Sequence, residues 1–239
     1  MTLFITFALG IFFIIGVFII KAAKNSEIVE HISIAIAFGA MITLAALDLI
    51  PEIIEDTTGE KAYIPVIFVI AGIGLLKVLD VFIPDHDSTE DIEKEMIHIG
   101  LISAFAIILH NVIEGMAVYG IALQSMREGL NLALGVGMHN IPMGMLIYST
   151  LQKEDRLKKY IVLAFAAGST FLGGVCMALM EGYMNGFMIG VLICITLGML
   201  IYILFFELLP YMVRTKKPAI SVIGTLAGIA VVVISMMLE

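Results

Sequence analysis

Eight apolar runs, each close to the length of a membrane-spanning helix, dominate this sequence. They fall near residues 3–20, 28–50, 63–83, 97–119, 130–151, 160–180, 187–209 and 219–238. About 20 consecutive apolar residues are needed for a helix to cross the hydrocarbon core of a bilayer. Only 14% of the residues are charged, and the runs lack the alternation of apolar and polar residues that membrane β-strands show. We therefore predict one all-α integral membrane domain over residues 1–239, with eight transmembrane helices.

Basic residues are distributed unevenly between the loops of this predicted topology. Ten of the 13 lie in the loops after the first, third, fifth and seventh helices or at the adjoining helix ends: Lys21, Lys24, Lys94, Lys153, Arg156, Lys158, Lys159, Arg214, Lys216 and Lys217. The opposite side has Lys61 and Arg127 only. Lys and Arg accumulate in cytoplasmic loops. We therefore expect an integral protein of the cell or plasma membrane with both termini on the outer side. The net charge of −8 lies in short acidic loops and does not suggest a nucleic-acid partner.

Two short motifs recur at positions that this topology places in oppositely directed helices. The second helix contains DLIPE (Asp48–Glu52), and the seventh contains ELLPY (Glu207–Tyr211). Likewise, HNVIEG (His110–Gly115) in the fourth helix resembles HNIPMG (His139–Gly144) in the fifth. We predict an inverted repeat of helices 1–3 and 6–8 around a central pair, which is typical of transporters with a site near the membrane midplane. Asp48, Glu52 and Glu207 are expected at helix ends, either solvated or along an ion pathway.

The fourth and fifth helices place ionisable side chains near the centre of the membrane. His110 and Glu114 are four residues apart and share one face of a helix. His139 lies at a comparable depth in the fifth helix. The neighbouring motif residues are Asn111, Asn140 and Met143. Ionisable groups within a membrane span usually face a partner or a cavity. Two imidazoles and one carboxylate suit a borderline cation such as Zn²⁺, while the alternative is a buried polar network that ties two helices together.

These features resemble the ZIP family of divalent-metal transporters, and in particular its GufA-type branch. The resemblance covers essentially the whole chain and rests on eight helices, the two His-Asn motifs and LIYILFFELLP in the seventh helix. Members of the family carry Zn²⁺, Fe²⁺, Mn²⁺ or Cd²⁺ toward the cytoplasm, and prokaryotic relatives have two adjacent metal sites. The resemblance implies a first site formed by His110, Glu114 and His139, with Met41 of the second helix near it.

The second site implied by the resemblance lacks its acids in this sequence. Asn111 and Asn140 match family positions, but Met143 stands where relatives have a bridging Glu. Aligning STFLGG (Ser169–Gly174) with the family pattern puts Gly173 where the sixth helix normally supplies another Glu, and Glu181 comes two turns too late. We therefore expect one metal site. An altered metal preference is the rival consequence, because a thioether is a weak ligand for Zn²⁺ and a better one for Cu(I) or Cd²⁺.

The sequence thus predicts a transporter, rather than an enzyme, that moves a divalent metal ion toward the cytoplasm, with Zn²⁺ the favoured substrate. One alternative is an intramembrane metal-dependent hydrolase that uses the same residues to activate water, although Glu114 would then have to be either ligand or base. A second alternative is a metal-binding membrane protein that does not transport. The expected partners are the metal ion and the lipid bilayer, and a homodimer is left open.

Overall fold

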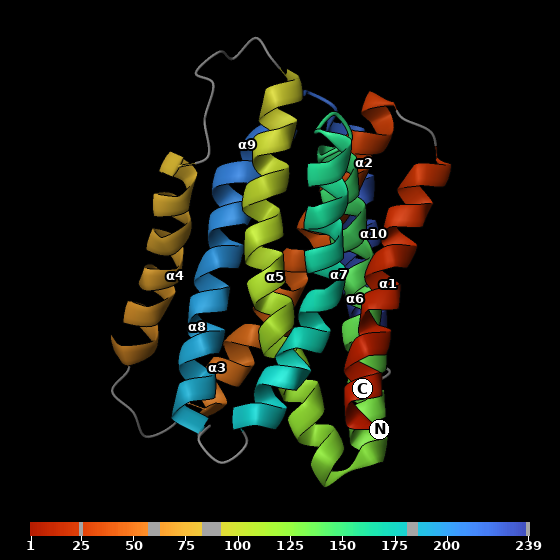
Figure 1. Ribbon diagram of the computed structural model, residues 1–239. Coiled ribbons are helices and arrows are strands. Elements are labelled where there is room, and N and C mark those ends of the chain that lie inside the picture. Colours follow the sequence, from red (N-terminus) through yellow and green to blue (C-terminus); the bar gives the residue numbers. More distant parts are fainter. Residues whose placement is uncertain (24–25, 57–62, 83–91, 181–185, 238–239) are drawn as a thin grey trace.

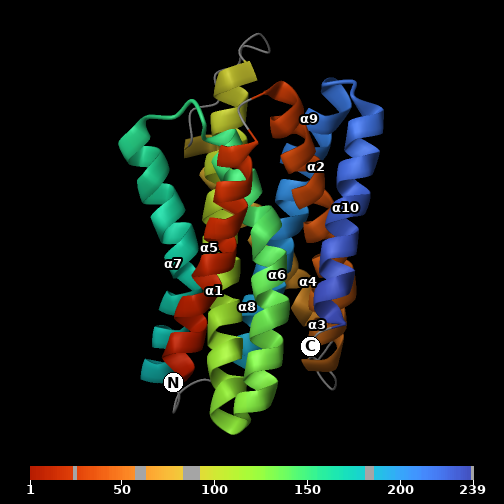
Figure 2. The ribbon, with the colours of Figure 1, turned by 90° about the vertical axis from the view of Figure 1, so that its right-hand side faces the viewer.

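The computed structural model is a bundle of eight helices long and apolar enough to cross a membrane (Figure 1). It describes residues 1–23, 26–56, 63–82, 92–180 and 186–237. The predicted all-α fold with eight spans is confirmed over these ranges. Both termini lie at the same end of the bundle, as an even number of crossings requires (Figures 1 and 2).

Six of the spans are single helices, and two are composite. The single helices are α1 (Thr2–Ala22), α4 (Tyr63–Phe82), α5 (Ile92–Gln124), α6 (Met126–Thr150), α7 (Arg156–Met180) and α10 (Pro218–Met236). The second span consists of α2 (Glu27–Leu44), the π-helical segment η1 (Ala45–Leu49) and α3 (Ile50–Asp56). The seventh consists of α8 (Gly186–Tyr202), the π-helical segment η2 (Ile203–Leu208) and α9 (Leu209–Arg214).

In each composite span, a single residue separates the π-helical segment from a proline. At the end of η1 the Ile50 N–H bonds to a carbonyl five residues back instead of four, and Leu209 does the same after η2. Pro51 and Pro210 have no N–H, and a proline ring crowds the carbonyl four residues earlier, so a widened turn relieves the clash. The helix therefore continues past both prolines.

This continuation corrects one expectation about the acids of the DLIPE and ELLPY motifs. The prediction of a helix end is wrong for Asp48 and Glu207, because their spans run on to residues 55 and 214, whereas Glu52 does lie in the last turn of its span. All three carboxylates lie inside membrane-spanning segments, where a charged group needs a partner or a water-filled cavity.

Reciprocal glycine pairs hold the helices together at four crossings. In each pair, a Cβ built on either glycine would overlap the carbonyl oxygen three residues before the other glycine. Glycine permits such backbone-to-backbone contact between membrane helices. The pairs are Gly16 and Gly144 between α1 and α6, Gly115 and Gly173 between α5 and α7, Gly39 and Gly228 between α2 and α10, and Gly72 and Gly198 between α4 and α8.

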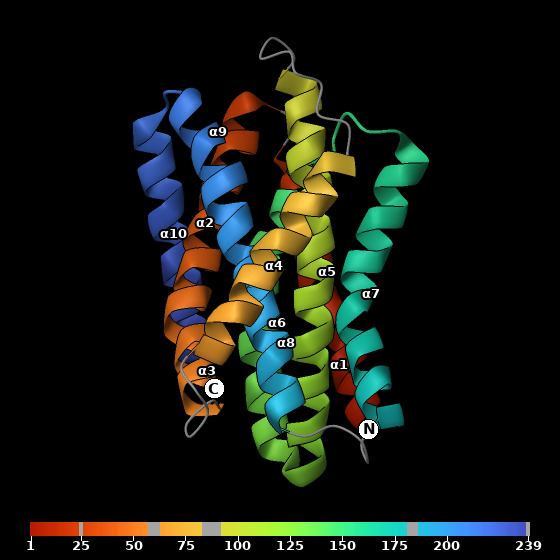
Figure 3. The ribbon, with the colours of Figure 1, turned by 90° about the vertical axis from the view of Figure 1, so that its left-hand side faces the viewer.

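The packing leaves α5 and α6 in the interior and α4 at the edge. In an 18-residue window of each span, 61% of positions in α5 and 67% in α6 are buried, against 11% in α4. Figure 3 shows α4 in front of α5 and α8, on the outside of the bundle. Interior helices can shelter polar side chains from lipid, where an unsatisfied polar group is costly. The central pair is therefore the part of the fold best suited to carry a polar site.

Candidate metal centre

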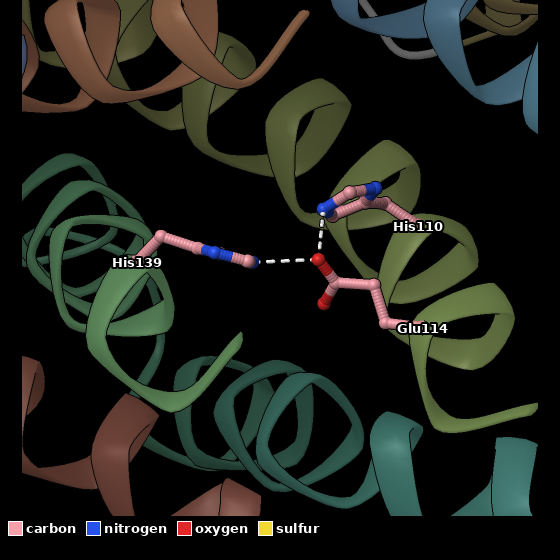
Figure 4. A group of neighbouring side chains, drawn as sticks. All are labelled: His110, Glu114 and His139. Carbon is pink, nitrogen blue, oxygen red and sulfur yellow. Dashed lines mark hydrogen bonds and ion pairs between the residues drawn. The ribbon is translucent and has the colours of Figure 1, made fainter. Parts of the chain in front are cut away.

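His110, Glu114 and His139 converge between α5 and α6 (Figure 4). The spacing of four residues on α5 stacks His110 above Glu114, with its Nε2 atom 2.9 Å from Glu114 Oε1. From α6, His139 Nε2 donates a hydrogen bond of 2.6 Å to the same oxygen. One carboxylate oxygen thus lies between two imidazoles, as the sequence predicts for two antiparallel helices that each supply part of one site.

The charge and spacing of these three side chains suit a divalent cation. All three are largely shielded from solvent, with side chains 2%, 11% and 4% exposed for His110, Glu114 and His139. One ligand atom from each lies within 4.8 Å of the other two. The second oxygen, Glu114 Oε2, is buried and has no hydrogen-bond partner among the described residues. Imidazole nitrogens and a carboxylate oxygen are ordinary ligands of Zn²⁺, and a buried unsatisfied oxygen is a group that a cation would stabilise.

A cavity of about 350 Å³ leads to this centre. His110, Glu114 and His139 form one part of its wall, and Glu55 near the end of α3 forms another. The remaining lining residues belong to η1, α3, the second half of α5 and the first halves of α6 and α8. These parts of the helices face the end of the bundle where both termini are found (Figure 1). The centre is therefore accessible from the terminal end.

Two of the three motif acids line the same cavity. Asp48 lies in η1 and Glu52 one turn further along in α3, and both form part of the wall that also contains Glu114. The widened turn before Pro51 thus occurs where the second span borders the centre. Carboxylates along an aqueous cavity attract cations and raise their local concentration. A role of these two residues in an ion pathway stays a prediction.

The other predicted ligands do not face this cavity. Met41 and Met143 are completely buried in the hydrophobic core. Asn111 donates a long hydrogen bond of 3.4 Å to the Ala166 carbonyl, and both amide atoms of the buried Asn140 lack a partner among the described residues. None of these four side chains is part of the cavity wall.

Gly173 stands where the resemblance would require an acid, and its surroundings leave no room for one. Its Cα faces the Val112 carbonyl, and Gly115 faces the Thr170 carbonyl in return. Any side chain at residue 173 would have to separate α5 from α7. Glu181, the other acid considered for the second site, and residues 84–91 of the acidic segment lie outside the described ranges.

A second group of potential ligands, which the sequence analysis missed, lies between α4, α5 and η2. His98 Nε2 is 3.0 Å from Asp80 Oδ1 and 3.9 Å from Glu207 Oε1. The other Asp80 oxygen accepts hydrogen bonds of 2.8 Å from Lys77 Nζ and from the Tyr202 hydroxyl. His98 and Glu207 are buried. The available signal was the same as for the first centre: Asp80 and His98 are ionisable residues within predicted apolar runs.

Comparison with known proteins places the chain beside zinc transporters. A sequence model of the family described as "ZIP Zinc transporter" matches residues 83–236, which include His110, Glu114 and His139. A "Zinc transporter ZupT" of Chlorobium chlorochromatii is 28% identical over 263 residues, covering 100% of this chain and 96% of that protein. The ZupT of Clostridium perfringens is 26% identical and covers 91% of this chain and 88% of its own length. The ZupT of Corynebacterium aurimucosum is 27% identical, with 86% and 84% covered.

Proposed function

We propose that this chain, which belongs to the ZIP family of zinc transporters, moves zinc across the membrane by binding it at His110, Glu114 and His139. The observation that carries this proposal is the convergence of two imidazoles on one carboxylate oxygen at a cavity that α5 and α6 line together with η1, α3 and α8. The donor set also suits Fe²⁺, Mn²⁺ and Cd²⁺, so competition between these ions during zinc uptake would rank them.

We propose a single central metal ion rather than a pair, and the residues around this centre support that number. Met143 offers no charge, and the contact of Gly173 with the Val112 carbonyl leaves no room for a second acid. Asn111 and Asn140 are neutral and cannot compensate a second divalent ion. The assignment to the GufA-type branch stays a prediction.

Transport toward the cytoplasm is the direction that the charges favour. The cavity opens at the end where the termini lie (Figure 1), and the nine described residues among the ten basic ones used to orient the chain belong to the opposite end. If the positive-inside rule holds here, metal enters from outside. The cluster of Asp80, His98 and Glu207 would then be a second binding site on the inner side, because its two carboxylates can bind an ion released from the centre.

Movement of the helices must close the outer cavity before the inner side opens. The reciprocal glycine pairs support the proposed inverted repeat. In such a repeat, spans 1–3 correspond to spans 6–8, and span 4 corresponds to span 5. The α1–α6 crossing then corresponds to the α7–α5 crossing, and the α2–α10 crossing to the α8–α4 crossing. The α1–α6 and α5–α7 crossings pack α1 and α7 closely against the two helices that carry the metal centre. We infer that α1, α5, α6 and α7 move together against the other four spans, as the units of inverted-repeat transporters do.

An intramembrane hydrolase is the weaker interpretation of the same residues. The relatives are named as transporters, and the family is one of transporters, so the chain is a transporter rather than an enzyme. The second alternative, a metal-binding membrane protein that does not transport, would show metal binding without uptake into vesicles. A homodimer stays a prediction that a measurement of molecular mass in detergent would test.

Zinc uptake into proteoliposomes tests the proposal directly. The purified full-length chain is reconstituted with a zinc-sensitive dye inside the vesicles, beside vesicles that contain the Glu114→Gln variant. Glu55→Gln is the matched control, because it makes the same change in the same cavity at an exposed position. We expect uptake by the parent and by Glu55→Gln, and none above background by Glu114→Gln. Uptake by Glu114→Gln at the parent's rate would contradict the assignment.

A further inference from the structure

A groove between α1 and α7 opens on the outer surface of the bundle, away from the metal centre. Its volume is about 260 Å³. Apolar side chains of the two helices form its walls: Phe13, Ile14, Val17, Leu163, Ala164 and Ala167. Because Ile14 and Ala164 are exposed, the groove faces the space that lipid occupies around the protein.

The groove exists because α1 and α7 pack against each other from the terminal end as far as Gly10 and separate beyond it. They meet where a Cβ on Gly10 would overlap the Ala167 carbonyl oxygen. On the side of this contact away from the termini, the start of α7 leans away from α1 (Figure 2). From Ala167 back to Lys159 the helix rises about 12 Å, at 1.5 Å per residue. This length and the apolar walls suit a segment of an acyl chain.

Lys21, Tyr148 and Tyr160 line one end of the groove, and Lys159 lies against the rings of both tyrosines. Lys159 Nζ lies 5.8 Å from the centroid of the Tyr148 ring and 5.9 Å from that of Tyr160, and it donates to the Gln152 carbonyl at 3.1 Å. Across the groove, Lys21 Nζ lies 5.9 Å from the Phe18 ring. Within the described ranges, neither lysine forms an ion pair with a carboxylate. Two positive charges therefore stand at the polar end of an apolar groove without a compensating acid.

We propose that this groove binds an anionic glycerophospholipid. Its acyl chain lies between α1 and α7, and its phosphate group lies between Lys21 and Lys159, within reach of the Tyr160 hydroxyl. Basic pockets between membrane helices recognise acidic headgroups in this way, and tyrosine belongs at the level of the headgroups because one end of its ring is apolar and the other polar. The proposal goes beyond metal transport and does not depend on it.

Charge complementarity separates this occupant from the other candidates. A hydrophobic peptide would fill the walls and leave both lysines uncompensated. A zwitterionic lipid carries its own positive group beside the phosphate and gains less from the two lysines. An anionic headgroup satisfies both lysines while its chain covers the apolar walls.

Native mass spectrometry of the purified full-length chain tests the proposal. Palmitoyl-oleoyl phosphatidylglycerol and the phosphatidylcholine with the same chains are titrated against the protein in detergent. We expect the anionic lipid to be retained about tenfold more strongly or better, because each lysine near the headgroup contributes to binding. The double variant Lys21→Gln/Lys159→Gln should lose this preference and bind both lipids alike.

A charge-matched control and a groove-filling variant complete the experiment. Lys158→Gln/Lys216→Gln removes two exposed lysines from the same end outside the groove and should keep the preference. Ala164→Trp leaves every charge in place, fills the groove at an exposed position, and should reduce retention of the anionic lipid. Equal retention of both lipids by the parent, an unchanged preference in the Lys21→Gln/Lys159→Gln variant, or undiminished retention of the anionic lipid by Ala164→Trp would overturn the proposal.

Discussion

The two buried clusters of histidine and carboxylate use the same ligand types with opposite proportions. The central cluster has two histidines and one acid, and it borders a cavity that opens at the terminal end. The second has one histidine and two acids, none of which lines that cavity, and its Asp80 already accepts bonds from Lys77 and Tyr202. This difference indicates that the two clusters have different roles in metal binding. The central cluster has an unsatisfied oxygen and access to solvent, whereas the second has its charge partly compensated by the protein.

The largest expected effect comes from removing the only acid of the central cluster. Glu114→Gln should weaken zinc binding roughly 100-fold or more, because losing a direct ligand costs at least as much as losing a residue that merely supports one. Isothermal titration calorimetry with the purified protein measures this change. An affinity within threefold of the parent would show that the metal binds elsewhere.

The second cluster should respond differently from the first. His98→Ala should change zinc affinity at the central cluster by less than about threefold, since well-separated sites affect one another little, and should slow uptake into vesicles instead. His139→Ala should abolish tight binding. The comparison fails if His98→Ala and His139→Ala reduce the affinity equally, because the clusters would then act as one site.

The α5–α7 crossing that supports the central cluster gives a smaller effect. Gly173→Ala should lower the stability of the folded protein by about 1–3 kcal/mol, because its methyl group collides with the Val112 carbonyl. Gly168 on the same helix has nothing within 4 Å of its Cβ position, so Gly168→Ala is the matched control. Thermal unfolding in detergent measures both. Equal losses in the two variants would mean that the close contact is not what stabilises this crossing.

The smallest effect is expected for Met143→Glu, which should not gain a second zinc ion. Met143→Glu restores one acid of the second family site, but Gly173 leaves no room for the other, so the variant should still bind one zinc ion in the centre. Metal analysis of the purified variant measures the ratio. A second tightly bound ion in Met143→Glu would show that a single acid is enough to rebuild the site.

The spans and the central cluster were predictable because each depends on local sequence. Hydropathy identifies helices that must cover a bilayer, and the spacing of His110 and Glu114 places both on one helical face whatever the rest of the fold does. Pairing with His139 also follows from the short connection between α5 and α6, which makes them antiparallel neighbours.

The features that sequence reasoning missed depend on packing between distant segments. A proline predicts an interruption, but whether the helix stops or widens into a π-helical turn depends on its neighbours. The same holds for Glu207, which meets Asp80 and His98 only because α4, α5 and η2 pack together. That Asn111, Asn140 and Met143 fall outside the cavity wall reflects the rotation of α5 and α6 about their axes, which motif spacing alone does not fix.

The central claim is that zinc binds at His110, Glu114 and His139 as a single ion. Its most direct test is the zinc content of the purified parent, of Glu114→Gln and of His98→Ala, measured by mass spectrometry of the metal after equilibration with buffered zinc. We predict one tightly bound ion in the parent, none in Glu114→Gln and one in His98→Ala. Two ions in the parent that are lost together in Glu114→Gln, or an unchanged content in that variant, would contradict the account.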